Sequence, residues 1–126
     1  MNHIPVAVGL LLCEQVIIDE KTKNLTPVNC FSSRKLANVP GTASFHVVAW
    51  LSDGLGEMDL KIVVEELGSS EEILRLEKKV RFDDRLKDMR FTARLRDCYF
   101  PVPGYYEVTL SIGGEFVAHR KLLIYV

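Results

Sequence analysis

The end of the chain, Phe100–Val126, alternates between apolar and polar residues with the period of a β-strand. A turn at Pro103-Gly104 opens the alternation, and Gly113-Gly114 then reverses the chain into a second apolar run. Four apolar residues between the two turns share one face: Tyr106, Val108, Leu110 and Ile112. Because side chains along a strand point alternately to opposite sides, this pattern predicts a β-hairpin with one buried face.

The same alternation, interrupted by Gly, Pro and Asp clusters, recurs along most of the chain. The expected strands are Val6–Ile18, Leu25–Ser32, Ala43–Ser52, Glu57–Glu66, Ile73–Phe82, Met89–Leu95 and the two strands of the closing hairpin. Ile73–Phe82 follows a helix-like start at Ser70, but a strand is favoured because its neighbours are strands and the gap is short. Strands at near-regular spacing predict an all-β fold: a single antiparallel immunoglobulin-like β-sandwich of about 7–9 strands over residues 1–126.

Two aromatic residues are expected in the core of this sandwich. Ala43–Ser52 is largely apolar on both faces, which predicts a central strand covered on two sides, with Trp50 buried. Tyr106 follows Gly104 by two residues, a position that suits a tyrosine corner, with the ring buried and the hydroxyl bonded to the backbone.

The net charge of −1 favours neither nucleic acid nor a membrane surface as a partner. The apolar run Ile4–Cys13 is too short for a membrane span, and no Lys or Arg precedes it, so we expect a buried strand rather than a signal sequence. Three cysteines do not make a disulfide framework and point to a reducing, cytoplasmic compartment. If Ile18 pairs with Leu25, Cys13 faces Cys30; two reduced thiols are favoured there over a bridge.

Two segments of the chain resemble a known family. The order LLC-x-x-V-I-I-x-E within Leu10–Phe31 and F-P-x-P-G-x-Y-x-V-x-L-x-I-x-G-x-x-V-A within Phe100–Val126 is similar to a family of small uncharacterised bacterial proteins. These proteins are expected to form immunoglobulin-like β-sandwiches and are known only as a domain of unknown function. The resemblance implies a fold and a bacterial origin, and it supplies no activity, cofactor or site.

Residues suited to catalysis or metal binding are scattered. His3, His46 and His119 are far apart in the sequence and lack metal-ligand spacing, so no metal or other cofactor is expected. Cys98 is the best candidate nucleophile, because it lies in an expected loop (Arg96–Pro103), but no histidine is near it in sequence. We therefore expect no catalytic residues and no enzyme; an enzyme built on Cys98 or a histidine is the weakest alternative.

Charge is distributed unevenly along the middle of the chain. Asp53–Glu72 holds seven acidic residues against Lys61 alone, whereas Arg75–Arg96 holds nine basic residues against four acidic ones. If the two strands of Arg75–Arg96 form a hairpin with Arg81 opposite Arg90, their outward residues form one basic face. Its members are Arg75, Lys79, Arg81, Arg90, Arg94 and Arg96. The alternatives are a solvated face neutralised by the neighbouring acidic strand, or a split of the two strands between sheets.

Tyr99 and Phe100 precede the loop Pro101–Pro103 and, with Tyr105, are candidates for an exposed apolar end that binds a partner. Packing of the sandwich end is the competing interpretation.

These patterns favour a non-enzymatic protein-interaction module with an acidic protein partner. No nucleic acid is expected, since no exposed aromatics alternate with the arginines as stacking platforms. The alternatives are a small-ligand or carbohydrate-binding β-sandwich, and a homodimer formed through an edge strand such as the final one.

Overall fold

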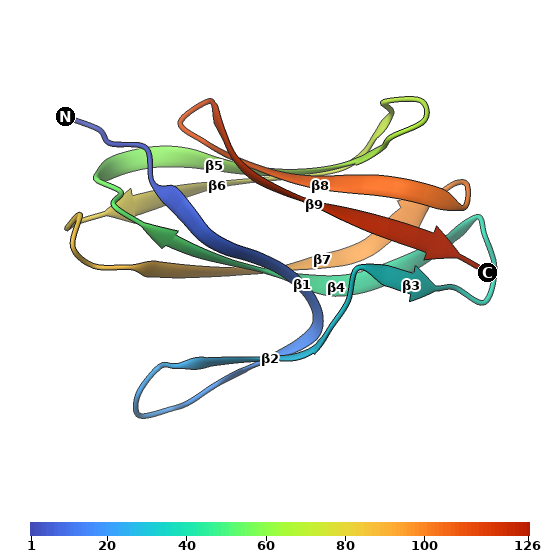
Figure 1. The fold of residues 1–126 in the computed structure, drawn as a ribbon, viewed down its shortest axis with the longest axis horizontal. Helices are drawn as coiled ribbons and strands as arrows, with labels where there is room; N and C mark the ends of the chain where they lie inside the picture. The colour runs from blue at the N-terminus through green and yellow to red at the C-terminus, as the bar shows by residue number, and fades with distance from the viewer.

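The computed structural model describes residues 1–126 and folds them into nine β-strands with no helix (Figure 1). The strands are β1 (Val6–Ile18), β2 (Leu25–Cys30), β3 (Ser33–Lys35), β4 (Gly41–Ser52), β5 (Gly56–Glu66), β6 (Glu72–Phe82), β7 (Met89–Phe100), β8 (Gly104–Ile112) and β9 (Glu115–Tyr125). They form a four-stranded sheet in the order β2-β1-β4-β7 and a five-stranded sheet in the order β3-β9-β8-β5-β6. Only the short β3 runs parallel to its neighbour, β9. The all-β prediction is therefore confirmed, including a strand rather than a helix at β6.

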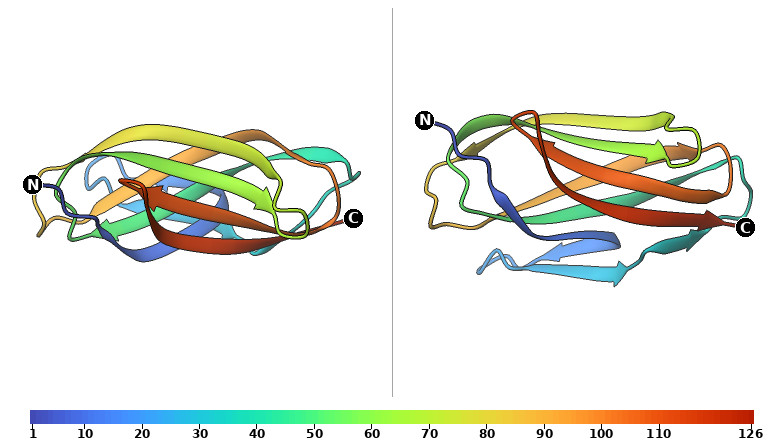
Figure 2. Two further views of the ribbon diagram at one scale, coloured as in Figure 1. Left: turned by 90° about the horizontal axis from the view of Figure 1, so that it is seen from above. Right: turned by 45° about the horizontal axis from the view of Figure 1, so that its top comes forward.

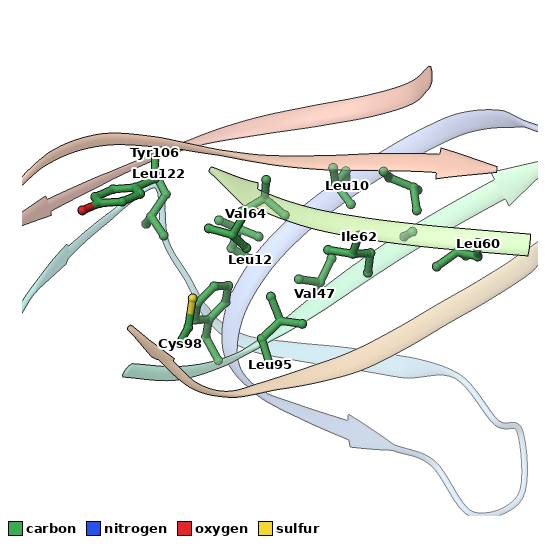
Figure 3. Close-up of a cluster of buried hydrophobic side chains, with 14 of the residues drawn as sticks. Leu10, Leu12, Val47, Leu60, Ile62, Val64, Leu95, Cys98, Tyr106 and Leu122 are labelled. Atoms are coloured by element: carbon green, nitrogen blue, oxygen red, sulfur yellow. The ribbon is translucent and has the colours of Figure 1, made fainter. Parts of the chain in front are cut away.

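The two sheets lie face to face, with one apolar core between them (Figures 1 and 2). The core contains 22 buried residues contributed by both sheets, among them Leu12 and Val47 from one sheet and Ile62 and Val64 from the other (Figure 3). The four residues predicted to share one face of β8 are all completely buried. Because the alternation is local, the inward face of this strand could be predicted without knowing its partners.

The turn between β8 and β9 depends on glycine. Gly113 has a φ of 62°, and a Cβ at this position would lie 2.7 Å from the Cδ1 atom of Ile4. Only glycine satisfies both the left-handed backbone and the close approach of the N-terminal segment.

Tyr106 forms the predicted tyrosine corner. Its ring is buried and packs edge-on against Phe100, with 4.9 Å between the ring centroids. Its hydroxyl donates a hydrogen bond to the carbonyl of Val102 and accepts one from the Val102 amide at 3.3 Å. The side chain therefore ties the β7–β8 connection to the start of β8.

The prediction of a loop over Arg96–Pro103 is wrong for residues 96–100, because β7 continues to Phe100. A bulge shifts the register between Ala43 and Phe45 of β4, and Asp97 opposite it has a φ of 50°. Across the bulge β7 has one residue more than β4, which breaks the alternation of β7. As a result the side chain of Phe100 points into the core, where none of its surface is exposed. Phe100 is therefore not the surface binding residue that the sequence suggested.

The edges of the two sheets carry residues that oppose further strand pairing. On the edge strand β6, Lys78 lies opposite the core residue Leu60 and so faces the interior side of its sheet. The edge strand β2 contains Pro27, which has no amide hydrogen to donate. An inward-facing charge and an edge proline both disfavour edge-to-edge association. The final strand, β9, is covered by β3 only at Leu123–Tyr125.

Replacing Tyr106 with Phe tests the tyrosine corner. Removing the hydroxyl leaves the backbone groups of Val102 without this partner, so the free energy of unfolding should fall by about 1–3 kcal/mol. The matched control is Tyr105→Phe, on an exposed neighbour with more than half of its surface accessible, which should stay within about 0.5 kcal/mol of the parent. Urea denaturation measures both; equal losses in the two variants would contradict this role.

Candidate functional site

The structure splits the basic face that the sequence suggested. β6 and β7 belong to different sheets, so Arg81 lies opposite Glu57 and Arg90 lies opposite Trp50, not opposite each other. The hairpin that a single basic face requires does not form, because the chain crosses from one sheet to the other at the turn between these strands. The alternative of a split between the sheets is the arrangement observed.

Three of the four basic residues on β6, all but Lys78, are paired with carboxylates. Arg75 lies 2.7 Å from Glu72, Lys79 lies 3.0 Å from Asp59, and Arg81 lies 2.8 Å from Asp83. The pKa of Glu72 is lowered chiefly by its hydrogen bond from Arg75. Exposed pairs of this kind add little to stability, and here they neutralise the positive charge of this strand except at Lys78.

The three basic residues on β7 have a different environment. Arg90, Arg94 and Arg96 are exposed and alternate with residues that pack on the core, so they share the outer face of the four-stranded sheet. We call them the β7 arginine row. No carboxylate lies within salt-bridge distance of any of the three, the eight ion pairs of the molecule all being elsewhere. Tyr99, half exposed, lies further along the same strand.

Trp50 is on the surface, and the prediction that it lies in the core is wrong. It projects from the outer face of β4 with 42% of its surface exposed. The guanidinium carbon of Arg90 lies 5.0 Å from the centroid of the Trp50 ring, and the indole Nε1 donates a hydrogen bond of 2.9 Å to Asp88. That hydrogen bond is the main cause of the lowered pKa of Asp88. The ring is thus held in place from two sides while part of its surface stays open.

The remaining outer face of β4 is covered by a hairpin of β1 and β2. β1 pairs with β4 from Val6 to Cys13 and then with β2 from Cys13 to Ile18. Figure 1 shows this second half of β1 bending away from β4 and running with β2, which forms the edge of the four-stranded sheet. Val48, beside Trp50 on the outer face, is only 6% exposed as a result.

A groove lies between this hairpin and the outer face of the sheet, and we call it the Trp50 groove. It has a volume of about 230 Å³, and Arg90 closes one side of it. Its other lining residues are Val8, Gly9, Leu11, Leu25, Pro27, Val48 and Trp50. A Cβ added at Gly9 would meet no atom within 4 Å, so the glycine adds to the open space. Sites for small organic ligands usually measure about 300–1,000 Å³, so this groove matches one or two side chains of a partner better.

A second depression lies at one end of the molecule. It has a volume of about 640 Å³ and is lined by Glu66, Leu67, Gly68, Pro103, Gly104, Tyr105 and Lys121. Tyr105 is exposed here, as predicted for an aromatic end, whereas Phe100 is not. The depression carries one aromatic ring and a charge of each sign, which makes it the place where the ligand-binding alternative would apply.

The candidate catalytic and metal-binding residues do not converge. Cys98 is buried, and burial raises its pKa to about 12. Each histidine has a separate partner: His3 lies 3.7 Å from Asp53, the His46 ring bonds the carbonyl of Glu14, and His119 lies 3.1 Å from Glu107. The structure contains no group of three or more His, Cys, Asp or Glu side chains placed to hold a metal ion.

Residues 9–125 match the model of a family of unknown function, DUF6941, and the chain belongs to this family. The match includes every strand from β2 to β9 and nearly all of the Trp50 groove. No curated protein matches the chain. The structure has no helix that is long and apolar enough to cross a membrane.

Sequence reasoning found the arginines of β7 but missed the groove beside them. The available signals were the apolar outer face of Ala43–Ser52, which no single neighbouring strand covers, and the apolar Leu25 and Pro27 in an otherwise polar hairpin. Whether Leu25 and Pro27 come to lie against the outer face of β4 depends on how β2 folds back, and no local sequence pattern specifies this.

Thiol labelling tests the assignment of Cys98 to the core. At about pH 8 a thiol with a pKa of about 12 stays protonated and unreactive, and Cys98 is also closed to solvent. We expect a disulfide reagent to modify the exposed Cys30 rapidly and Cys98 only after unfolding, as read by peptide mass spectrometry. A Cys30→Ser variant should lose the fast phase. Fast labelling of Cys98 in the folded protein would contradict this picture and would reopen the possibility of a nucleophile.

Proposed function

We propose that this chain is a non-enzymatic protein-interaction module that binds an acidic segment of a partner protein on the outer face of its four-stranded sheet. In this proposal one apolar side chain of the partner enters the Trp50 groove, and acidic side chains next to it pair with the β7 arginine row. One observation carries the proposal: the single tryptophan of the chain stands partly exposed in an apolar groove beside arginines without carboxylate partners.

The composition of this face supports binding rather than mere solvation. Tryptophan and arginine are enriched among residues that dominate binding energies, particularly where apolar surface is ringed by polar groups. An exposed Trp50 next to Val8, with 65% of its surface open, leaves apolar area uncovered by this chain. A partner that buries about 200 Å² of this area gains roughly 5 kcal/mol from the hydrophobic effect before its costs of association.

The charge of the face supports an acidic partner. Arg94 and Arg96 lie along the strand from Arg90 and face solvent, and the nearest strand, β4, offers them no acidic side chain. Unpaired arginines attract carboxylates from a distance and fix the register of a bound segment. A basic partner would meet repulsion along the whole row.

We also propose that the fold is immunoglobulin-like. When β2 and β3 are set aside, the sheets run β1-β4-β7 and β9-β8-β5-β6, which matches the A-B-E and G-F-C-C′ arrangement of that class. The tyrosine corner at the start of β8 is a further hallmark. In place of the inter-sheet disulfide of antibody domains the chain has free cysteines, which is in keeping with a place in the bacterial cytoplasm.

The ligand-binding alternative applies to the depression at Tyr105, which reaches the volume of a small-molecule site. Small-ligand sites are mostly apolar with a few convergent polar groups. At Tyr105 only two of the seven lining residues are apolar, so the Trp50 groove is the better supported site.

Selection from a library of random peptides displayed on phage tests the proposed chemistry of the partner. We expect the selected peptides to share one large apolar residue flanked by Asp or Glu, and to bind less tightly as salt screens their charges. Binding should change the fluorescence of Trp50, which is the only tryptophan. Selected peptides that are basic, or that leave the tryptophan signal unchanged, would contradict the proposal.

Variants locate the binding on the surface. Trp50→Ala should weaken the selected peptides about 30-fold, the equivalent of a loss of about 2 kcal/mol. Replacing both Arg94 and Arg96 with Glu should weaken peptide binding at low salt even more than Trp50→Ala does. The matched controls are Phe116→Ala, an exposed aromatic residue on β9, and Arg81→Glu, in the other sheet. Labelled-peptide anisotropy measures affinity and circular dichroism checks the fold; equal effects of control and test variants would rule out this face.

A further inference from the structure

Two of the three cysteines lie opposite each other on adjacent strands. Cys13 of β1 and Cys30 of β2 are Cα partners in the antiparallel register, as the pairing of Ile18 with Leu25 predicted. Opposite residues in an antiparallel pair have Cα atoms about 4.5–5.5 Å apart, which falls within the range that a disulfide spans. Both cysteines are present as free thiols.

The two thiols differ in their access to solvent. Cys13 is completely buried, whereas Cys30 is exposed. Cys30 also lines a depression of about 200 Å³ that includes Arg120 of β9, so a small anionic reagent can approach it. Burial, and secondarily the nearby Cys30 thiol, raise the pKa of Cys13. The influence of Cys30 on Cys13 is a second sign that the two sulfur atoms are close.

We propose that Cys13 and Cys30 form a reversible redox pair, in which Cys30 reacts with a small-molecule disulfide and Cys13 resolves the product into an intramolecular disulfide. This modification site is independent of the proposed binding function. It requires only the register of β1 and β2 and the exposure of Cys30.

The reaction takes place in two exchanges. The Cys30 thiolate attacks one sulfur of a disulfide such as oxidised glutathione, forms a mixed disulfide and expels one glutathione thiolate. The Cys13 sulfur attacks the sulfur of Cys30 and expels the second glutathione group, which leaves with the Cys13 proton as a thiol. The protein thiols lose two electrons and two protons in total, and the two electrons convert the small disulfide into two thiols. Reduced dithiothreitol reverses both exchanges.

The bridge would act on one element of the fold. β2 has no strand neighbour other than β1, and Cys30 is its last residue. A covalent link at this end holds β2 against β1 and restricts the separation of the two strands. The amides of β2 should therefore exchange their hydrogens more slowly in the bridged form.

The test uses the full chain, first reduced and then incubated with oxidised glutathione without denaturant. We expect a product lighter than the reduced protein by two hydrogen atoms, with the Cys13–Cys30 bond identified by peptide mapping. Its thermal midpoint should rise by several degrees, and dithiothreitol should restore the starting mass and midpoint. A protein that accumulates as the mixed disulfide, forms no adduct at all, or bridges through Cys98 would overturn the proposal.

Three variants separate the roles of the thiols. Cys13→Ser should stop at the mixed disulfide with Cys30, and Cys30→Ser should give neither adduct nor bridge. Cys98→Ser is the control and should bridge as the parent does. If Cys13→Ser fails to fold, slower exchange of the β2 amides in the oxidised Cys98→Ser protein still tests the pair; unchanged exchange rates on oxidation would count against it.

Discussion

The apolar outer face of β4 is the constraint on which the rest of the surface depends. The inner face of this strand packs in the core, as any central strand requires, but Val48 and Trp50 on its other side also need cover from water. β1 supplies that cover by running past the end of its pairing with β4 and folding back with β2. The hairpin buries Val48 but covers only part of Trp50. The Trp50 groove is the space left between the hairpin and the outer face of β4.

The partial exposure of Trp50 is held in place by its neighbours. A large aromatic ring exposed on a surface loses conformational freedom only if something orients it, and here Arg90 lies over the ring while Asp88 accepts from the indole. A cation over an indole contributes about 0.5–1 kcal/mol at an exposed site. The ring is therefore already oriented, so the binding proposed for this face would not bear the cost of ordering it.

Local patterns in the sequence were sufficient for most of the strands but not for the candidate site. The alternation in β8 specifies its buried face, and the position of Tyr106 after Gly104 specifies the tyrosine corner, because both depend on neighbouring residues only. The sheet to which a strand belongs depends on pairing across long separations, so the sequence leaves open whether β6 and β7 pair or lie in different sheets. Phe100 was misplaced for a related reason: the bulge at Asp97 inverts the alternation, and nothing in the local pattern marks it.

Nearby carboxylates, on the facing strand or along the same segment of chain, decide which basic side chains are paired. On β6 the neighbouring strand β5 places Asp59 across from Lys79, and an ion pair of 3.0 Å forms. On β7 the neighbouring strand β4 places Trp50 across from Arg90, in the part of its outer face that lies against the hairpin. A carboxylate at such a position would be driven into an apolar contact at a cost of several kcal/mol. The packing that anchors the β1–β2 hairpin thus disfavours an acidic residue opposite Arg90, and His46 lies opposite Arg94, so β4 supplies no carboxylate to either arginine.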